Sequence, residues 1–159
     1  MNKSSSARKN SGKKLEAIFH RGIPLTLKMG IKVVDYDGCR LRLAADFDKN
    51  RNVHGTGFAG SLYSLAACAG WGLLYLRLDE EKLQTKLVIR KGTIKYHYEV
   101  TGSMAAECVL NADDFNRFLA ELKQTNTASI QLKSSIDCKA KTAVIFSGNY
   151  VAKLESGKN

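Results

Sequence analysis

Paired cysteines are missing from this sequence of 159 residues. No C-x-x-C pair occurs, and the four cysteines lie far apart, at Cys39, Cys68, Cys108 and Cys138. Each lies in or beside an apolar stretch, where a free cysteine behaves as a small hydrophobic residue. The sequence therefore predicts neither a zinc site nor a disulfide framework. We expect a reduced, cytoplasmic protein that needs no metal and no cofactor.

Acidic residues are absent from the first 14 positions, which hold five lysines and arginines and so supply half of the net charge of +10. This segment is rich in serine and lysine and lacks the apolar core of a signal peptide. We expect a disordered basic tail over residues 1–14, followed by a single domain over residues 15–155. The remaining positive charge is spread along expected strands, without an arginine-rich helix, and so no nucleic-acid partner is expected.

Charge is also absent from the internal segment from Gly57 to Leu76, which follows a polar, glycine-rich loop over residues 52–56. The apolar part is about long enough to cross a membrane. Its glycines and alanines make its hydrophobicity modest, however, and the segments around it alternate as soluble strands do. The sequence therefore predicts a buried helix wrapped by a sheet, and no membrane span.

Alternating apolar and polar residues on both sides of this helix predict strands with one buried face. The expected strands cover residues 29–34, 39–45, 86–100, 104–110, 128–137 and 142–153. A short first helix is expected to end at Gly22 and Pro24, Gly92 is expected to mark a bulge or bend, and Asn111 is expected to cap a further helix. The predicted fold class is α+β, an antiparallel sheet of about six strands wrapped around a long central apolar helix.

The run H-G-T-G-F-A-G-S-L-Y-S-L-A-A-C-A-G-W-G-L-L-Y-L, residues 54–76, resembles the thioesterases related to the YiiD C-terminal domain. Those proteins have a similar G-T-x-F-x-G-S-L-Y signature followed by A-G-W-G. From about residue 15 to residue 154, the order of elements resembles the hotdog fold. The resemblance implies a homodimer or a dimer of dimers. It also implies a metal-independent site for acyl-CoA or acyl-carrier-protein thioesters, at the subunit interface beside the N-terminus of the central helix.

Hydrolysis of a thioester needs a polarised carbonyl group and an activated water. Backbone N–H groups near Ala59, Gly60 and Ser61 are expected to polarise the carbonyl, because they lie in the first turn of the helix. Asn52 is expected either to orient the water or to form an Asx turn, and His54 to act as a base or donor or to be a plain loop residue.

Substrate contacts are expected from the same region. Thr56 is expected to bind substrate or to cap the helix. Arg90 and Lys91 are expected either to contact the phosphates of coenzyme A or an acidic carrier protein, or to form a solvated strand face. The other expected contacts are Phe58, Ala59, Tyr63 and Ser64. His20 and His97 are expected to have structural or surface roles.

A carboxylate is missing where several hotdog thioesterases carry one. Those enzymes combine an H-G-G loop with an acid about two turns into the central helix, whereas the present sequence has Phe58-Ala59-Gly60 and Ala67 at these places. This excludes a carboxylate of the helix as general base or nucleophile, and it argues against the hotdog hydroxyacyl-thioester dehydratases. An acid would have to come from Asp46, from Asp48 or from another strand. The alternative is a non-catalytic module that binds acyl thioesters, and a surface binder that uses the basic tail is a third possibility.

Overall fold

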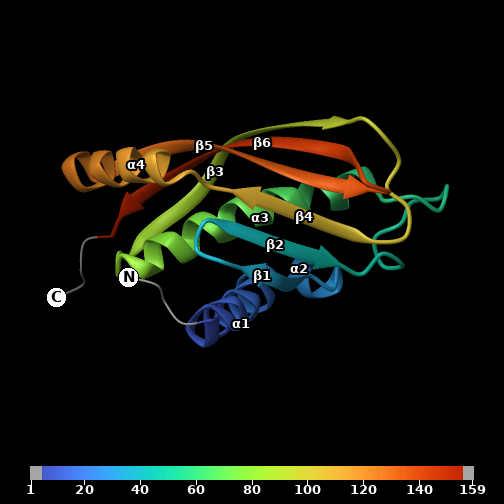
Figure 1. Cartoon of the computed structure of the whole chain (residues 1–159), viewed down its shortest axis with the longest axis horizontal. Helices are drawn as coiled ribbons and strands as arrows, with labels where there is room; N and C mark the ends of the chain where they lie inside the picture. Colours follow the sequence, from blue (N-terminus) through green and yellow to red (C-terminus); the bar gives the residue numbers. More distant parts are fainter. Residues whose placement is uncertain (1–4, 156–159) are drawn as a thin grey trace.

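The computed structural model describes residues 5–155, which form one sheet and four helices (Figure 1). The elements in chain order are α1 (Ser5–Gly22), α2 (Pro24–Lys28), β1 (Lys32–Tyr36), β2 (Arg40–Ala45), α3 (Ala59–Glu80), β3 (Thr85–Tyr96), β4 (Met104–Val109), α4 (Ala112–Thr125), β5 (Thr127–Cys138) and β6 (Lys141–Leu154).

The sheet has six strands in the order β1-β2-β4-β5-β6-β3, and every neighbouring pair is antiparallel. It curves around α3, as Figure 1 shows. The predicted α+β class, with a sheet of six strands and a long central helix, is therefore confirmed.

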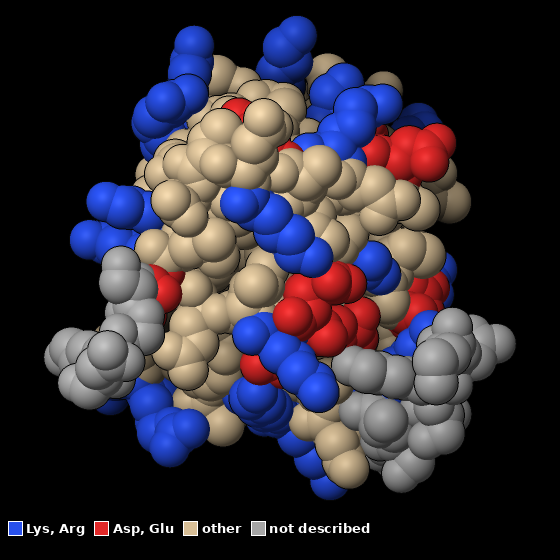
Figure 2. Space-filling view, turned by 90° about the vertical axis from the view of Figure 1, so that its left-hand side faces the viewer, with Lys and Arg blue, Asp and Glu red and all other residues tan. Residues whose placement is uncertain are grey.

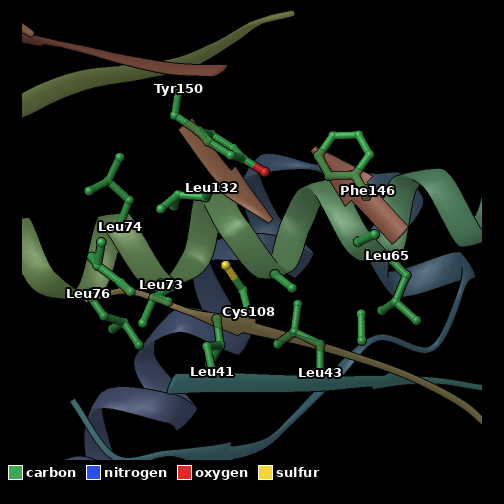
Figure 3. Close-up of a cluster of buried hydrophobic side chains, with 14 of the residues drawn as sticks. Leu41, Leu43, Leu65, Leu73, Leu74, Leu76, Cys108, Leu132, Phe146 and Tyr150 are labelled. Carbon is green, nitrogen blue, oxygen red and sulfur yellow. The ribbon is translucent and has the colours of Figure 1, made fainter. Parts of the chain in front are cut away.

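Helix α3 has the apolar surface that a central helix needs. Its leucines pack between the two arms of the curved sheet, with Leu41 and Leu43 of β2 on one side and Phe146 and Tyr150 of β6 on the other (Figure 3). By length and composition alone α3 is apolar enough to cross a membrane, a property that it shares with core helices of soluble proteins. The contacts with the sheet account for the lack of charge in α3 before Arg77.

Tyr150 crosses α3 where the helix carries glycine instead of a larger residue. The buried ring lies against Gly70, and its hydroxyl donates a hydrogen bond to the backbone oxygen of Ala67 at 2.8 Å. A Cβ atom on Gly70 would overlap the Tyr150 hydroxyl. The glycine thus lets a strand and the central helix approach closely, and burial raises the pKa of Tyr150 above its ordinary range.

Helix α1 differs from the expected tail. It begins at Ser5, so residues 5–14 are helical instead of disordered, and residues 1–4 lie outside the described residues. Gly12 is buried, and a Cβ there would lie 3.0 Å from Cγ1 of Val33 in β1. The Nζ atom of Lys14 pairs with Oδ1 of Asp79 in α3 at 2.8 Å. These tertiary contacts order a segment whose composition alone predicted disorder.

The other boundaries mostly follow the sequence. Asn111 caps α4 as predicted, because its side chain accepts a hydrogen bond from the N–H of Asp113 at 2.8 Å. The expected strand 86–100 ends early, at Tyr96. Its bulge lies between Ile89 and Lys91, and not at Gly92 as predicted. Gly92 instead leaves room for the Tyr63 hydroxyl, which a Cβ atom would overlap.

All four cysteines are free thiols, as predicted, and their environments differ. Burial raises the pKa of Cys68 and of Cys108 to about 11. A side-chain hydrogen bond to Asp37 raises the pKa of Cys39. The backbone N–H of Thr101 donates to Sγ of Cys138 at 3.4 Å and lowers the pKa of that thiol. Cys138 is therefore the thiol whose reactive thiolate form is favoured by its surroundings.

Surface charge is mixed at the end of the molecule that faces left in Figure 1. Figure 2 shows Lys and Arg side chains distributed around this end, with Asp and Glu side chains among them. Elsewhere in the described chain basic residues are also paired with acids, as Arg40 is with Asp35 at 3.0 Å. The positive net charge thus does not collect into one continuous patch on this face.

Candidate active site

The loop before α3 is anchored by a buried asparagine that the sequence analysis did not single out. Nδ2 of Asn50 donates to the backbone oxygens of Met29 at 2.8 Å and of Asp46 at 2.6 Å. The backbone oxygen of Asn50 accepts a hydrogen bond from the N–H of Phe58 at 2.8 Å. These bonds fix the point at which the chain enters the helix.

Asn52 closes the loop with both ends of its carboxamide. Oδ1 accepts from the N–H groups of His54 at 2.9 Å and Thr56 at 3.2 Å, and Nδ2 donates to Oγ1 of Thr56 at 3.0 Å. This is the Asx-turn arrangement, one of the two roles that the sequence left open for Asn52. Its further role in orienting a water stays a prediction.

His54 lies at the exposed tip of this loop. Its imidazole makes no hydrogen bond within residues 5–155. The next residue, Gly55, has a φ of +76°, which glycine adopts without strain and which turns the chain back toward α3. The imidazole is therefore free to bond a molecule bound beside the loop.

The N-terminus of α3 presents backbone donors. Its N-cap residue is Phe58, so Thr56 is not the helix cap, and the first turn carries no side-chain cap and no acid. Within the described chain, the N–H groups of Ala59, Gly60 and Ser61 have no hydrogen-bond acceptor. Such free donors at the positive end of a helix favour an anionic or carbonyl oxygen.

Gly60, expected to lie beside the thioester carbonyl, lies against the ring of Phe58. A Cβ atom at this position would lie 2.6 Å from Cε1 and 3.0 Å from Cζ of the Phe58 ring. The glycine therefore lets the half-exposed Phe58 ring fold over the first turn of α3. A side chain at residue 60 would therefore displace that ring.

An open cavity of about 390 Å³ lies beside the loop and the helix N-terminus. Its lining residues are Asn52, His54, Thr56, Gly57, Ala59, Leu62, Tyr96, His97, Tyr98, Glu99 and Val100. The structure thus brings together four of the predicted site residues, namely Asn52, His54, Thr56 and Ala59. A cavity of this size, with a few polar groups converging on it, is typical of small-molecule sites.

The far wall of the cavity is the segment that follows β3. Tyr96 donates its hydroxyl to the backbone oxygen of Ala59 at 2.9 Å, which ties this wall to the first turn of α3. His97 was expected to have a structural or surface role, and it lines the cavity with Glu99. Neither the Tyr96–Ala59 hydrogen bond nor the place of His97 and Glu99 in the cavity wall was predicted. The alternation of apolar and polar residues continues through this segment, so the sequence predicted that the strand continues as well.

Two predicted helix residues serve packing. The ring of Tyr63 meets the ring of Phe146 edge-on, with centroids 4.9 Å apart, and Ser64 donates its hydroxyl to the backbone oxygen of Gly60 at 2.9 Å. Neither side chain lines the cavity, and neither do Phe58, Gly60 and Ser61. Their predicted contacts with substrate remain predictions.

Arg90 and Lys91 are exposed residues at the bulge of β3 and do not line the cavity. Basic residues closer to it come from another element. Nζ of Lys141, at the start of β6, lies 5.4 Å from the centroid of the Tyr98 ring in the cavity wall. These two residues are far apart in the sequence, and the antiparallel pairing of β3 with β6 brings them together.

The fold is shared with solved structures. A protein of unknown function from Chlorobaculum tepidum TLS is 30% identical, with a TM-score of 0.90 over 93% of this chain and 97% of its own. A protein described as a "putative thioesterase" from Shewanella oneidensis is 25% identical, with a TM-score of 0.84 over 91% and 99% of the two chains. The Escherichia coli PaaI protein of the phenylacetic acid degradation operon shares the fold at 14% identity, with a TM-score of 0.63 over 95% and 98%.

The sequence also matches a protein-family model. The model is described as "Putative thioesterase (yiiD_Cterm)" and matches residues 12–154. The match includes the loop, the central helix and both walls of the cavity, and it confirms the resemblance carried by residues 54–76. This chain belongs to the YiiD C-terminal family of thioesterases, which has the hotdog fold.

Proposed function

We propose that the protein hydrolyses acyl thioesters carried by coenzyme A or by an acyl-carrier protein. The observation that carries the proposal is the cavity beside the N-terminus of α3, where Ala59 and the loop residue His54 line the same space. Free backbone donors and a free imidazole are two kinds of group that can polarise a thioester carbonyl.

The proposed chemistry assigns a role to each group. The N–H groups at the start of α3 donate to the thioester oxygen as it gains negative charge, an effect worth about 3–4 kcal/mol for one donor in other hydrolases. His54 donates a hydrogen bond to the thioester carbonyl oxygen, the donor role expected for it from the sequence. No step in this proposal uses a metal, and the described residues include no cluster of His, Cys, Asp and Glu suited to bind one.

The proposal includes a homodimer or a dimer of dimers, with the site at the subunit interface. It is supported by strand β3, which forms one edge of the sheet and exposes most of its residues. An edge strand of this kind can pair with a second copy of itself. The mass of the protein in solution, measured by light scattering, tests this part separately.

An acyl-CoA panel of increasing chain length, assayed by release of the free thiol, tests the hydrolase. We expect turnover of at least one member, reduced about 100-fold by His54→Ala. Exchange of the exposed Asp48 for asparagine is the control, because Asp48 lies in the same loop region but does not line the cavity. Absence of turnover by the unaltered protein on every acyl-CoA and acyl-carrier-protein substrate would refute the proposal.

A non-catalytic acyl-thioester binding module is the second candidate. It is favoured by one observation, namely that α3 carries no acid before Asp79. This candidate predicts that the protein binds acyl-CoA, measured by calorimetry, without releasing thiol.

A further inference from the structure

The carboxylate that α3 lacks has a counterpart on the opposite wall of the cavity. Glu99 lines the cavity together with His54 and Ala59. It follows β3 in the sequence, and helix α3 and strand β3 separate it from the loop that forms the other wall. The structure therefore places an acid, an imidazole and the start of the central helix around one space.

The chain on both sides of Glu99 is fixed against the site. The backbone oxygen of Val100 accepts a hydrogen bond from the N–H of Gly57 at 2.8 Å. A Cβ atom on Gly57 would lie 3.3 Å from Cβ of Val100, so the two backbones are in close contact. Glu99 is thus held next to the last residues of the loop that precedes α3.

The other side of this segment is fixed to the sheet and the helix. The N–H groups of His97 and Tyr98 both donate to the backbone oxygen of Ala143 in β6, at 2.7 Å and 3.2 Å. The Tyr96 hydroxyl bonds the first turn of α3, as described above. Residues 96–100 are therefore anchored to three elements, and the position of Glu99 relative to the loop follows from the fold.

The other candidate acids are elsewhere or already engaged. Asp46 accepts hydrogen bonds from the N–H groups of Asp48 and Lys49, at 3.1 Å and 3.4 Å. Its other oxygen pairs with Nζ of Lys49 at 3.3 Å. The side chain of Asp48 is 90% exposed, and Oδ1 lies 3.9 Å from Nε of Arg51. Glu99 is the one carboxylate among the described residues that lines the cavity.

We propose that Glu99 is the general base that activates water in this site, an inference that rests on the proposed hydrolysis of thioesters. The Glu99 carboxylate takes a proton from water as the water oxygen forms a bond to the thioester carbonyl carbon. The carbonyl electron pair moves onto oxygen, which the N–H groups at the start of α3 stabilise. When the carbonyl re-forms, the C–S bond breaks with its electron pair on sulfur. The proton held by Glu99 then passes to that thiolate, which leaves a free thiol and a carboxylic acid.

Glu99→Gln tests this role, because glutamine keeps the shape and polarity of the side chain and cannot accept the proton. The best acyl-CoA substrate of the unaltered protein is used for kcat, and its thioether analogue, which cannot be hydrolysed, is used for Kd. We expect kcat to fall by at least about 100-fold while Kd changes by less than about threefold. Glu99→Asp is expected to retain part of the activity, and Asp48→Asn all of it.

The outcomes separate the two proposals. If the unaltered protein turns over substrate and the Glu99→Gln variant has a similar kcat, the proposed role of Glu99 is refuted. The proposed hydrolysis of thioesters is not affected by that result. A loss of thioether binding equal to the loss of kcat also overturns it, because Glu99 would then be a binding residue. An unaltered protein without turnover overturns the proposed function and the role of Glu99 with it.

Discussion

Gly70→Ala is expected to destabilise the protein, although the same exchange usually stabilises a helix. An added Cβ would overlap the Tyr150 hydroxyl and lie 2.7 Å from Cζ and 2.9 Å from Cε2 of the ring. Tyr150 is fully buried, so the ring has no solvent to move into. Gly72, two residues along α3, is crowded in the same way by three apolar side chains.

The expected magnitude follows from two opposing effects. Alanine gains about 1 kcal/mol over glycine within a helix. Overpacking of a full core costs about 1–3 kcal/mol, and displacement of Tyr150 breaks its hydrogen bond to Ala67, worth about 1 kcal/mol. The net loss is therefore about 1–3 kcal/mol, which corresponds to a decrease of roughly 3–10 °C in Tm for a domain of this size.

Two further variants make this measurement decisive. Gly22→Ala, at the end of α1, places a Cβ where no atom lies within 4 Å, and it is expected to leave the Tm unchanged or raise it. Tyr150→Phe removes the hydroxyl oxygen, the nearest of the three Tyr150 atoms that crowd the new Cβ. In the double variant with Gly70→Ala, the loss should be smaller than the sum of the single losses by about 1 kcal/mol. Additive losses, or a rise in Tm for Gly70→Ala, would refute the packing argument.

Three further predictions concern the site and its surroundings. His54→Ala should lower kcat about 100-fold without changing the circular dichroism spectrum, and an unchanged kcat would remove His54 from the mechanism. Gly60→Ala should displace the Phe58 ring and lower turnover, with a change in unfolding free energy below about 1 kcal/mol since that ring is half-exposed. Cys138 should be alkylated first among the four cysteines at neutral pH, because its lowered pKa raises the thiolate fraction, whereas the other three have raised values. Mass spectrometry after brief iodoacetamide treatment checks the order. Thr101→Val should slow this reaction only in part, since the backbone N–H that bonds Sγ remains.

The central helix and the sheet were predictable because their signals are local. Leu41 and Leu43 are buried, whereas Arg40 before them and Arg42 between them are not, and this alternation is visible in the sequence. The cap at Asn111 has a local signal too, since an asparagine precedes two acids and an apolar stripe. In each case the residues that decide the structure lie within a few positions of one another.

The cavity was predicted on one side only. The loop with Asn52, His54 and Thr56 was found from its residue types and from its place before an apolar helix. The opposite wall depends on where β3 ends, and alternation continues past Tyr96 without a break. The strand ends there because His97 and Tyr98 both bond Ala143, a contact made by the packing of β3 on β6.

The helical conformation of residues 5–14 was missed for a related reason. Residues 1–14 have the composition of a disordered tail. Composition, however, carries no information on which surfaces of the folded domain a segment can pack against. Gly12 packs against Val33 because β1 and the first helix lie together in the folded chain. A glycine, which has no apolar side chain, thus forms part of a tertiary contact that no hydrophobic pattern indicates.

The absence of an acid from α3 before Asp79 follows from the same packing that the Gly70 variant tests. In the middle of the helix the surroundings oppose charge, since burial raises the pKa of Cys68 to about 11 and also raises the pKa of Tyr150. Ala67 precedes Cys68 directly, its backbone oxygen accepts the Tyr150 hydroxyl, and it is partly buried, so a carboxylate there would lose part of its hydration. The cavity wall has no such restriction, because Glu99 is exposed there. Because Tyr150 packs onto glycine in the central helix, the middle of that helix disfavours a charged side chain. The exposed segment after β3 tolerates one, and Glu99 lies there beside the cavity.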